Sequence, residues 1–322
     1  IQGINYTLKN LEGWMKPSKR HVSVLFQPAS NRVHYQPKGV VGVIVPWNYP
    51  LFLAVGPLIT ALSAGNRAMI KMSESTPRTA EVLEQLLGEI FPQDHVAVVT
   101  GEADVGVAFS KLAFDHLLFT GATSIGRHVM RAAADNLTPV TLELGGKSPA
   151  IVSADVPLAD AAERIAFGKG VNAGQTCVAP DYILCPRDRV EELTQALHTQ
   201  FAQMYPNLRD NADFTQVINP RQYQRLQSYL NDAEEKGARI LPINPGNEDL
   251  SGTRIIAPTL LLDVNDDMKV MQEEIFGPVL TVFRVEDLDE AVRISNDVQF
   301  GLSSSIYTRD LTRAFQYVDR VE

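Results

Sequence analysis

One cysteine in this sequence stands in a setting where a thiol could act as a nucleophile. Cys177 lies in a glycine-containing loop, residues 174–180 (GQTCVAP), between a helix-like segment and a strand-like one. A reactive cysteine needs thiolate character and access, and such a loop offers access. The alternative is an inert buried cysteine, which is the usual state of a lone thiol. Cys185 lies inside the apolar run 182–185, and there we expect the inert kind.

Two polar side chains accompany apolar, strand-like runs. Glu143 is the single acid in VTLELGG (140–146), and Asn48 follows the run 39–45 within PWNYP (46–50). A buried carboxylate is costly unless it is paired, so Glu143 is either a general base held near the working pH or an outward-facing strand residue. Asn48 is either an ordinary turn residue or an amide donor at the carboxyl end of a strand, where open α/β sheets bind ligands.

Two further patterns lie at strand ends. FTGATSIG (119–126) is a strand-to-helix turn whose amide groups could hold a phosphate, but it lacks the full G-x-G-x-x-G pattern and is a weak signal alone. Lys71 and Glu74 follow another strand, and without a ligand they would be solvated charges. No motif joins any of the six histidines to Cys177, which argues against a cysteine protease, and no ligand spacing predicts a metal site.

The segments that would position these residues alternate between strand and helix. Apolar strand-like runs lie at 39–45, 67–72, 96–100, 116–120 and 140–144, and helical patterns lie between them at 51–65, 76–91, 103–111 and 124–135. Such alternation predicts βαβ units and a parallel sheet with helices on both faces. It continues beyond the paired glycines at 145–146 with segments at 149–152, 159–171, 182–185, 189–205, 259–264, 279–285, 288–297 and 303–308.

The paired glycines Gly145 and Gly146 mark the predicted boundary between two α/β domains, residues 1–144 and 145–322. Two stretches fall outside the alternating pattern. Residues 1–38 carry a basic cluster and are predicted to be a solvated arm, and residues 206–258 are rich in polar and turn-forming residues.

Composition limits the classes of function. Of the 322 residues, 45% are hydrophobic and 21% are charged, which is ordinary for a soluble globular protein. The net charge of −9 argues against nucleic acid or an anionic membrane surface as a partner. Two cysteines make no disulfide framework, so a reducing, cytoplasmic compartment is expected. The apolar stretch 51–63 is shorter than the roughly 20 residues of a membrane span and predicts a buried helix.

Taken together, six motifs resemble the aldehyde dehydrogenase superfamily, and they occur in the family's order. They are PWNYP (46–50), KMSE (71–74), FTGATSIG (119–126), LELGGKSP (142–149), GQTC (174–177) and EEIFGP (273–278). The intervals from Glu143 to Cys177 and from Cys177 to Glu274 look like the family's as well. Residues 138–149 and 172–185 resemble the class 3 branch, and residues 6–44 are similar to bacterial coniferyl aldehyde dehydrogenases. The resemblance covers essentially the whole chain.

This resemblance implies a Rossmann-like, parallel-sheet NAD(P)-binding domain over residues 1–144 and a second α/β catalytic domain over residues 145–322. It assigns Cys177 as the nucleophile, Glu143 as the base, and Asn48 with the Cys177 backbone N–H as the oxyanion hole. It also implies a set of cofactor-binding residues: Pro46, Trp47, Lys71, Glu74, Thr120, Gly121, Ala122, Gly126, Leu144, Glu274 and Phe276. Two positions depart from the family, since Ala122 replaces a frequent serine and Met72 a common proline.

The resemblance therefore implies NAD(P)-dependent oxidation of an aldehyde to a carboxylic acid, with coniferyl aldehyde as the first substrate to consider. NAD is the expected cofactor and NADP is an open alternative. A medium- or long-chain fatty aldehyde remains an alternative substrate, and a cofactor-independent cysteine esterase or thioesterase remains an alternative activity. We expect a small-molecule partner and no nucleic acid or membrane.

Family members have a helical stretch before the point where this sequence begins and a long C-terminal portion after the point where it ends. That portion carries strands used in oligomers, so the family fold is expected to be truncated at both ends of this chain. We therefore expect residues 1–322 alone to be poorly soluble and nearly inactive, and the full-length form to be a homodimer or higher homo-oligomer.

Overall fold

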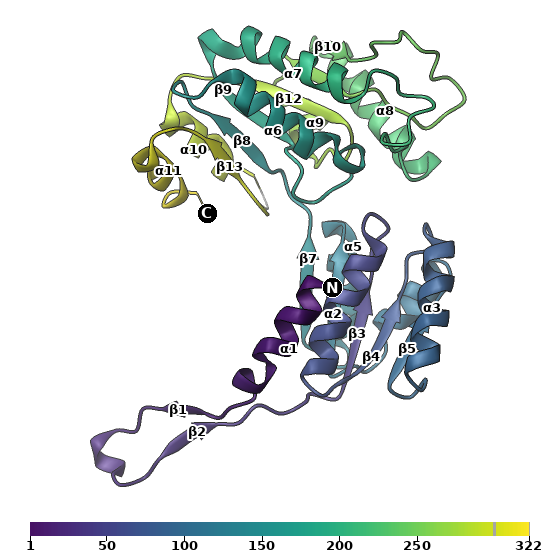
Figure 1. Cartoon of the computed structure of the whole chain (residues 1–322), viewed down its shortest axis with the longest axis vertical. Helices are drawn as coiled ribbons and strands as arrows, with labels where there is room; N and C mark the ends of the chain where they lie inside the picture. Colours follow the sequence, from purple (N-terminus) through teal and green to yellow (C-terminus); the bar gives the residue numbers. More distant parts are fainter. Residues whose placement is uncertain (299–300, 322) are drawn as a thin grey trace. The chain divides into compact units, whose positions relative to one another are not determined.

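A five-stranded sheet is the centre of residues 1–144 (Figure 1). Its strands are β3 (Val40–Ile44), β4 (Arg67–Lys71), β5 (Val96–Val99), β6 (His116–Gly121) and β7 (Val140–Leu144). In this computed structural model, which describes residues 1–298 and 301–321, the strand order is β5–β4–β3–β6–β7, and every neighbouring pair is parallel. Each strand coincides with a predicted apolar run, because a strand covered on both faces needs apolar side chains in both directions.

Four helices connect these strands and cover both faces of the sheet (Figure 1). They are α2 (Pro50–Ser63), α3 (Pro77–Ile90), α4 (Ala103–Ser110) and α5 (Thr123–Ala134). One apolar cluster joins α2 and α3 to the face that carries Val43 and Ile70, and another joins α4 and α5 to the face that carries Phe119. The predicted α/β architecture is therefore confirmed.

The connections place the carboxyl ends of β3 and β6 at a point where the chain reverses its direction of travel across the sheet. From β3 the chain runs outward to β4 and β5, and it then returns to the other side of β3 to form β6 and β7. Ligands of open parallel sheets bind at such a switch point, beyond the carboxyl ends of the strands. Asn48 follows β3 and Ala122 follows β6, so both lie at this edge.

Residues 1–38 contain more regular structure than the sequence pattern predicted. They form helix α1 (Gln2–Trp14) and an antiparallel pair, β1 (Ser18–Arg20) and β2 (Asn31–Val33), joined through the 3-10 turn η1 (Val24–Phe26). Their side chains are nearly all exposed or half-buried, as expected of an arm. Within the described ranges, none of the helices combines the length and apolarity that a membrane crossing requires.

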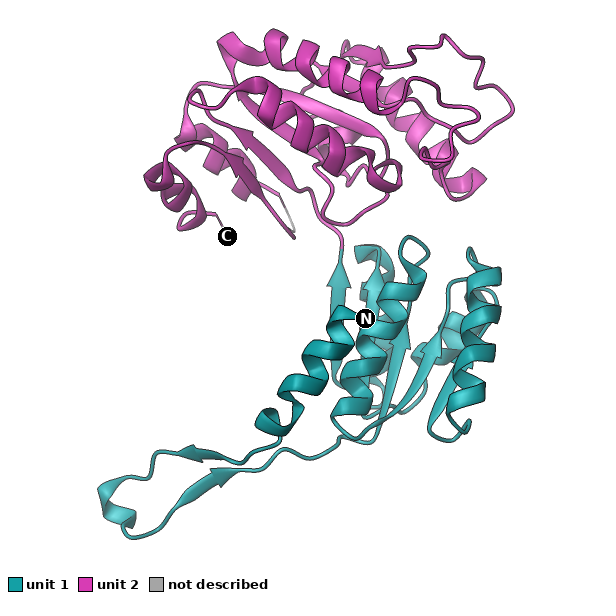
Figure 2. Ribbon diagram, in the orientation of Figure 1, with its two compact units in different colours: residues 1–144 teal, residues 145–322 magenta. Residues whose placement is uncertain are grey.

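The chain divides into two compact units at Leu144 and Gly145, and the second unit has a sheet of its own (Figure 2). The strands of this sheet are β8 (Pro149–Val152), β9 (Tyr182–Pro186), β10 (Arg239–Pro242), β11 (Thr259–Leu262), β12 (Val279–Val285) and β13 (Ser305–Tyr307). Their order is β10–β11–β12–β9–β8–β13. All neighbours are parallel except the edge strand β10, which runs antiparallel to β11.

Helices cover both faces of this second sheet too. The connecting elements are α6 (Leu158–Gly170), η2 (Val171–Gly174), η3 (Arg187–Arg189), α7 (Val190–Met204), α8 (Pro220–Glu235), α9 (Lys269–Gln272), α10 (Leu288–Asn296) and α11 (Leu311–Val318). The largest core joins α6 and α7 to one face, and two smaller cores join α8 with α9, and α10 with α11, to the other. Helix α8 and strand β10 lie in the polar stretch 206–258, where the sequence predicted no element.

Gly42 offers a test of the packing in the first unit. It lies in the central strand β3, and a Cβ added there would be 2.7 Å from two ring carbons of Phe114. Gly42→Ala is therefore expected to lower the free energy of unfolding by about 1–3 kcal/mol. The matched control is Gly88→Ala in α3, where no described atom beyond the adjoining residues and the backbone of the helix itself lies within 4 Å of the new methyl group. That change is expected to raise the free energy of unfolding by about 0.5–1 kcal/mol, because alanine favours a helix more than glycine does. Urea denaturation measures both, and equal effects would contradict this packing.

Candidate active site

Cys177 follows a backbone turn that few sequences tolerate. Helix α6 ends at Gly170, and in the next turn Asn172, Ala173 and Gly174 have φ angles of 51°, 50° and 70°. These values lie in the left-handed region, which is costly for residues other than glycine. A side chain at position 174 would collide with the backbone of Gly277, so only glycine fits there. The turn ends at Cys177, whose side chain is half-buried.

The two cysteines differ in burial. Cys185 is fully buried in β9, and burial raises the pKa of its thiol to about 12. A thiol with that pKa forms almost no thiolate at neutral pH and is a poor nucleophile. Neither cysteine forms a disulfide. Among the described residues, no three His, Cys, Asp or Glu side chains gather in a way that would hold a metal ion.

A buried ion pair fixes the segment that carries Glu274 and Phe276. The Lys147 ammonium group bonds to the Asp181 carboxylate and donates to the carbonyl oxygens of Val270 (2.8 Å) and Glu273 (3.2 Å). The other oxygen of Asp181 accepts from the Ile275 N–H at 2.9 Å. Both charged residues are more than nine-tenths buried, and these bonds offset the cost of removing their charges from water.

Arg225 in α8 holds the same segment from another side. Its guanidinium donates to the carbonyl oxygens of Glu274 (3.1 Å) and Ile275 (2.7 Å). Phe276 follows with a φ of 49°, a strained value for a bulky residue that its surroundings must enforce. No sequence pattern indicated a role for Lys147, Asp181 or Arg225. Lys147 did stand within a recognised motif, but its partners are visible only in the fold.

The Glu274 carboxyl group has an unusual environment. One of its oxygens accepts from the Gly146 N–H at 3.2 Å, and Gly145 lies so close to the carboxylate that a Cβ there would collide with it. Burial, followed by the nearby charge of Asp181, raises the pKa of Glu274 to about 7. Because it changes charge near neutral pH, this carboxyl group can accept or release a proton under working conditions.

In the first unit, the candidate residues lie beyond the carboxyl ends of neighbouring strands. Pro46, Trp47 and Asn48 follow β3 and are half-buried, while Thr120 near the end of β6 is buried. Gly121 completes β6, and Ala122 is the N-cap of α5, with no side-chain cap among the described residues. The amide groups of that first turn can therefore serve a ligand.

Gly126 allows α5 to approach β7 closely. A Cβ at this position would lie 2.7 Å from a methyl carbon of Leu144. Glycine is thus required by packing between the helix and the strand, and it brings the first turn of α5 towards the edge of the sheet where β7 ends.

The sequence left alternatives open for three charged residues, and the structure shows how exposed each of them is. Lys71 is not a solvated charge: its side chain is buried, and its ammonium group donates to the carbonyl oxygens of Met72 (2.6 Å) and Gly101 (2.8 Å). Burial lowers the pKa of Lys71, partly opposed by Glu74 and neighbouring acids. Glu143 is exposed, so it needs no compensation for burial, and the outward-facing alternative describes its position. Glu74 is exposed, as the solvated alternative predicted.

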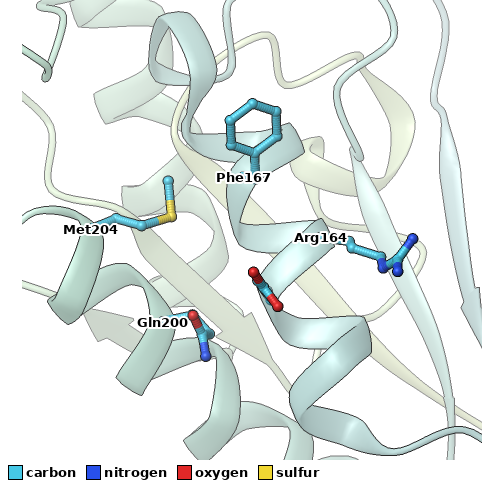
Figure 3. A pocket seen from close by; sticks show the side chains of 5 residues that line it. Arg164, Phe167, Gln200 and Met204 are labelled. Carbon is cyan, nitrogen blue, oxygen red and sulfur yellow. The ribbon is translucent and has the colours of Figure 1, made fainter.

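The fold thus gathers the candidates in two groups. Asn48, Lys71, Glu74, Thr120 and their neighbours share one edge of the first sheet. In the second unit, the turn before Cys177 contacts the segment 274–277 through Gly174 and Gly277. A separate hollow lies between α6 and α7, as Figure 3 shows. The candidate residues are not among those that line it: Glu163, Arg164, Phe167, Gln200 and Met204.

Comparisons with known proteins agree on one family. Residues 3–322 match the sequence model described as the aldehyde dehydrogenase family. A probable coniferyl aldehyde dehydrogenase of Pseudomonas aeruginosa is 63% identical over 296 residues, which cover 92% of this chain and 61% of that protein. The coniferyl aldehyde dehydrogenase of a Pseudomonas species is 48% identical over 322 residues, covering 99% of this chain and 66% of that protein. The chain thus spans less than two thirds of the length of either relative.

Solved structures similar to this chain belong to the same family. The substrate-bound state of Staphylococcus aureus AldH has a TM-score of 0.91 and 37% identity, and the match covers 100% of this chain and 69% of that one. A Mycobacterium tuberculosis aldehyde dehydrogenase complexed with NAD+ has a TM-score of 0.89 and 34% identity, covering 99% and 66% respectively.

The raised pKa of Glu274 has a consequence for stability. As pH rises from the ordinary carboxyl pKa towards 7, the unfolded chain releases this proton before the folded one, so folding is increasingly opposed. Glu274→Gln removes the ionisation, and at pH 8 it should raise the free energy of unfolding by up to about 3 kcal/mol. At pH 5 the gain should be much smaller. Urea denaturation at the two pH values measures it, and an equal gain at both would refute the assigned environment.

Proposed function

The chain belongs to the aldehyde dehydrogenase family, and we propose that it carries the catalytic centre of an enzyme that oxidises an aldehyde to a carboxylic acid with NAD(P) and water. The observation that carries this proposal is the setting of Cys177. Its thiol is half-buried at the end of a strained turn, and that turn packs on the segment bearing Glu274. A structural cysteine such as Cys185 needs no such turn.

In the proposed reaction, the Cys177 sulfur attacks the aldehyde carbon. A carbon–sulfur bond forms, the carbonyl π bond becomes a lone pair on oxygen, and the thiol proton passes to Glu143 or to water. The Asn48 amide and the Cys177 N–H donate hydrogen bonds to the oxygen as its charge develops. The carbon–hydrogen bond of this adduct then breaks as the oxygen lone pair re-forms the carbonyl π bond, which leaves a thioester on Cys177; NAD(P), when bound, would be the acceptor of that hydride. Water activated by Glu143 then breaks the carbon–sulfur bond and releases the acid and the thiol.

The residues of the first unit fit a dinucleotide. The uncapped first turn of α5 offers amide groups to the pyrophosphate, and Gly126 provides the close approach of helix and strand that such sites need. We assign the ribose of the adenosine to Lys71 and Glu74, the nicotinamide ribose to Glu274, and the flank of the nicotinamide ring to Phe276. On this proposal, residues 1–144 form the cofactor-binding domain and residues 145–322 form the catalytic domain.

Glu74 favours NAD over NADP. Its exposed carboxylate can accept a hydrogen bond from a free ribose hydroxyl, whereas it would repel a 2′-phosphate by roughly 1–4 kcal/mol at about 4 Å. The Lys71 ammonium group keeps its positive charge while it donates to two backbone carbonyl oxygens, so it offsets part of this repulsion and NADP stays the alternative cofactor.

An aromatic aldehyde such as coniferyl aldehyde is the substrate we propose. Support comes from relatives at 63% and 48% identity that are named for this substrate. We also propose a cytoplasmic location, which suits two free thiols, and a homo-oligomeric state. The arm supports association, since Val24, Leu25 and Phe26 are 80%, 85% and 68% exposed.

A pair of cysteine variants tests the proposed activity. Cys177→Ala in the full-length protein should reduce the rate of NADH formation from coniferyl aldehyde by at least about a thousandfold, because no other group supplies the nucleophile. Binding of NAD, measured by calorimetry, should stay within about twofold of the parent value. Cys185→Ala is the matched control and should retain most of the activity, since its thiol is inert. Substantial turnover by Cys177→Ala would refute the mechanism, and turnover of thioesters without nucleotide would favour a hydrolase.

A further inference from the structure

The turn that precedes Cys177 is not held by the preferences of its own backbone. Asn172 and Ala173 adopt left-handed φ angles in succession, and such a conformation persists only where the surrounding structure enforces it. Gly174 continues in the same region with a φ of 70°. Something beyond this turn must therefore hold it in place.

Gln175 supplies that hold through its side-chain amide. The Nε2 group donates to the carbonyl oxygen of Asn172 at 3.1 Å and to that of Gln216 at 3.2 Å, and the Oε1 atom accepts from the Ile218 N–H at 3.0 Å. Both ends of the amide thus bind backbone groups, so a rotated or shifted amide would lose bonds at each end. The residue is 1% exposed, so these bonds are made away from water.

The segment on the far side of the amide is itself anchored. The Val217 N–H donates to the carbonyl oxygen of Arg254 at 3.0 Å, and the Arg254 side chain donates back to the carbonyl oxygen of Val217 at 2.8 Å. Val217 is buried in the core that also contains residues of α8 and β11. Gln175 therefore connects the turn to a firmly packed part of the second unit.

The stretch after Gln175 makes local contacts of its own. The Ala179 N–H donates to the carbonyl oxygen of Thr176 at 3.0 Å, which closes a local turn around the cysteine. The Ser148 hydroxyl reaches the carbonyl oxygen of Cys177 at 3.5 Å, the limit of a hydrogen bond. These two contacts stay within the neighbourhood of the cysteine, whereas the Gln175 amide reaches residues 216–218.

We infer that Gln175 is a positioning residue for the nucleophile: its amide locks the left-handed turn 172–174 to residues 216–218 and so sets the direction from which the Cys177 sulfur meets a carbonyl carbon. This inference rests on the proposed role of Cys177. Because Gln175 is buried, it acts through Cys177 and touches neither aldehyde nor cofactor. A small displacement of a reacting atom is enough to slow a reaction about a hundredfold.

Gln175→Met tests the inference, because methionine fills a similar volume and makes none of the three amide bonds. The matched control is Gln224→Met, which makes the same change on the exposed surface of α8. In the full-length protein with saturating NAD, the single-turnover rate of NADH formation should fall about 10- to 100-fold for Gln175→Met and stay unchanged for Gln224→Met. The dissociation constant of NAD should remain within about twofold, which a general loss of structure would not allow.

A second variant guards against misfolding. Gln175→Asn keeps the amide but is one methylene shorter, so it cannot bridge Asn172 to residues 216–218. Circular dichroism and the melting temperature show whether Gln175→Met folds. If it does not, the single-turnover rate of Gln175→Asn tests the inference instead, with the same expected fall. A single-turnover rate within twofold of the parent in a folded variant would overturn the inference.

Thiol labelling separates this inference from the proposed function. The rate at which iodoacetamide alkylates Cys177 needs no aldehyde, and it should change at least about threefold in the Gln175 variant while Gln224→Met leaves it unchanged. If the parent protein oxidises no aldehyde, the proposed function fails, and the labelling rates still decide about Gln175. Equal labelling rates in parent and variant would then overturn the positioning role.

Discussion

The backbone of Gly174 lies against the carbonyl group of Gly277, with no room for a side chain between them. This close approach joins two segments that are about a hundred residues apart in the sequence, one ending at Cys177 and the other carrying Glu274 and Phe276. It requires a left-handed φ at Gly174 and strained angles at Asn172, Ala173 and Phe276. The nearby side chains compensate for this strain: Gln175 holds one segment, and Lys147, Asp181 and Arg225 hold the other.

Titratable side chains that are largely shielded from water cluster beside this contact. Lys169, at the end of α6, is buried beside this contact, and burial lowers the pKa of its ammonium group to about 8, opposed by Asp181. Burial has the opposite effect on Glu274 and raises the pKa of its carboxyl group to about 7. Burial disfavours the charged form of both groups, so their ordinary pKa values, six units apart, approach each other. The segment that we assign to the nicotinamide ribose thus lies in a cluster that can exchange protons near neutral pH.

Much of the fold could be predicted, because the strands of both sheets are apolar in both directions and stand between clear helical patterns. The inert state of Cys185 followed from the same pattern. The burial of Lys71 could not be predicted in this way, because its ammonium group bonds to backbone carbonyl groups that only the fold brings near. For Glu143 the sequence left two alternatives open, and the structure shows the outward-facing one, in which strand alternation exposes the carboxylate. Helix α8 was not predicted because it lies in a polar stretch and buries only a narrow stripe of side chains, Leu226, Tyr229 and Ala233. The roles of Lys147, Asp181 and Gln175 depend on tertiary contacts that no local pattern records.

The central claim is that Cys177 forms a covalent thioester, and mass spectrometry of the protein tests it most directly. Full-length protein would be mixed with coniferyl aldehyde and NAD and quenched in acid within the first turnover. The peptide containing Cys177 is expected to gain the mass of the acyl group, this gain should require NAD, and Cys185 should stay unmodified. Formation of NADH and acid with Cys177 unmodified at every quench time, or an acyl group on another residue, would contradict it.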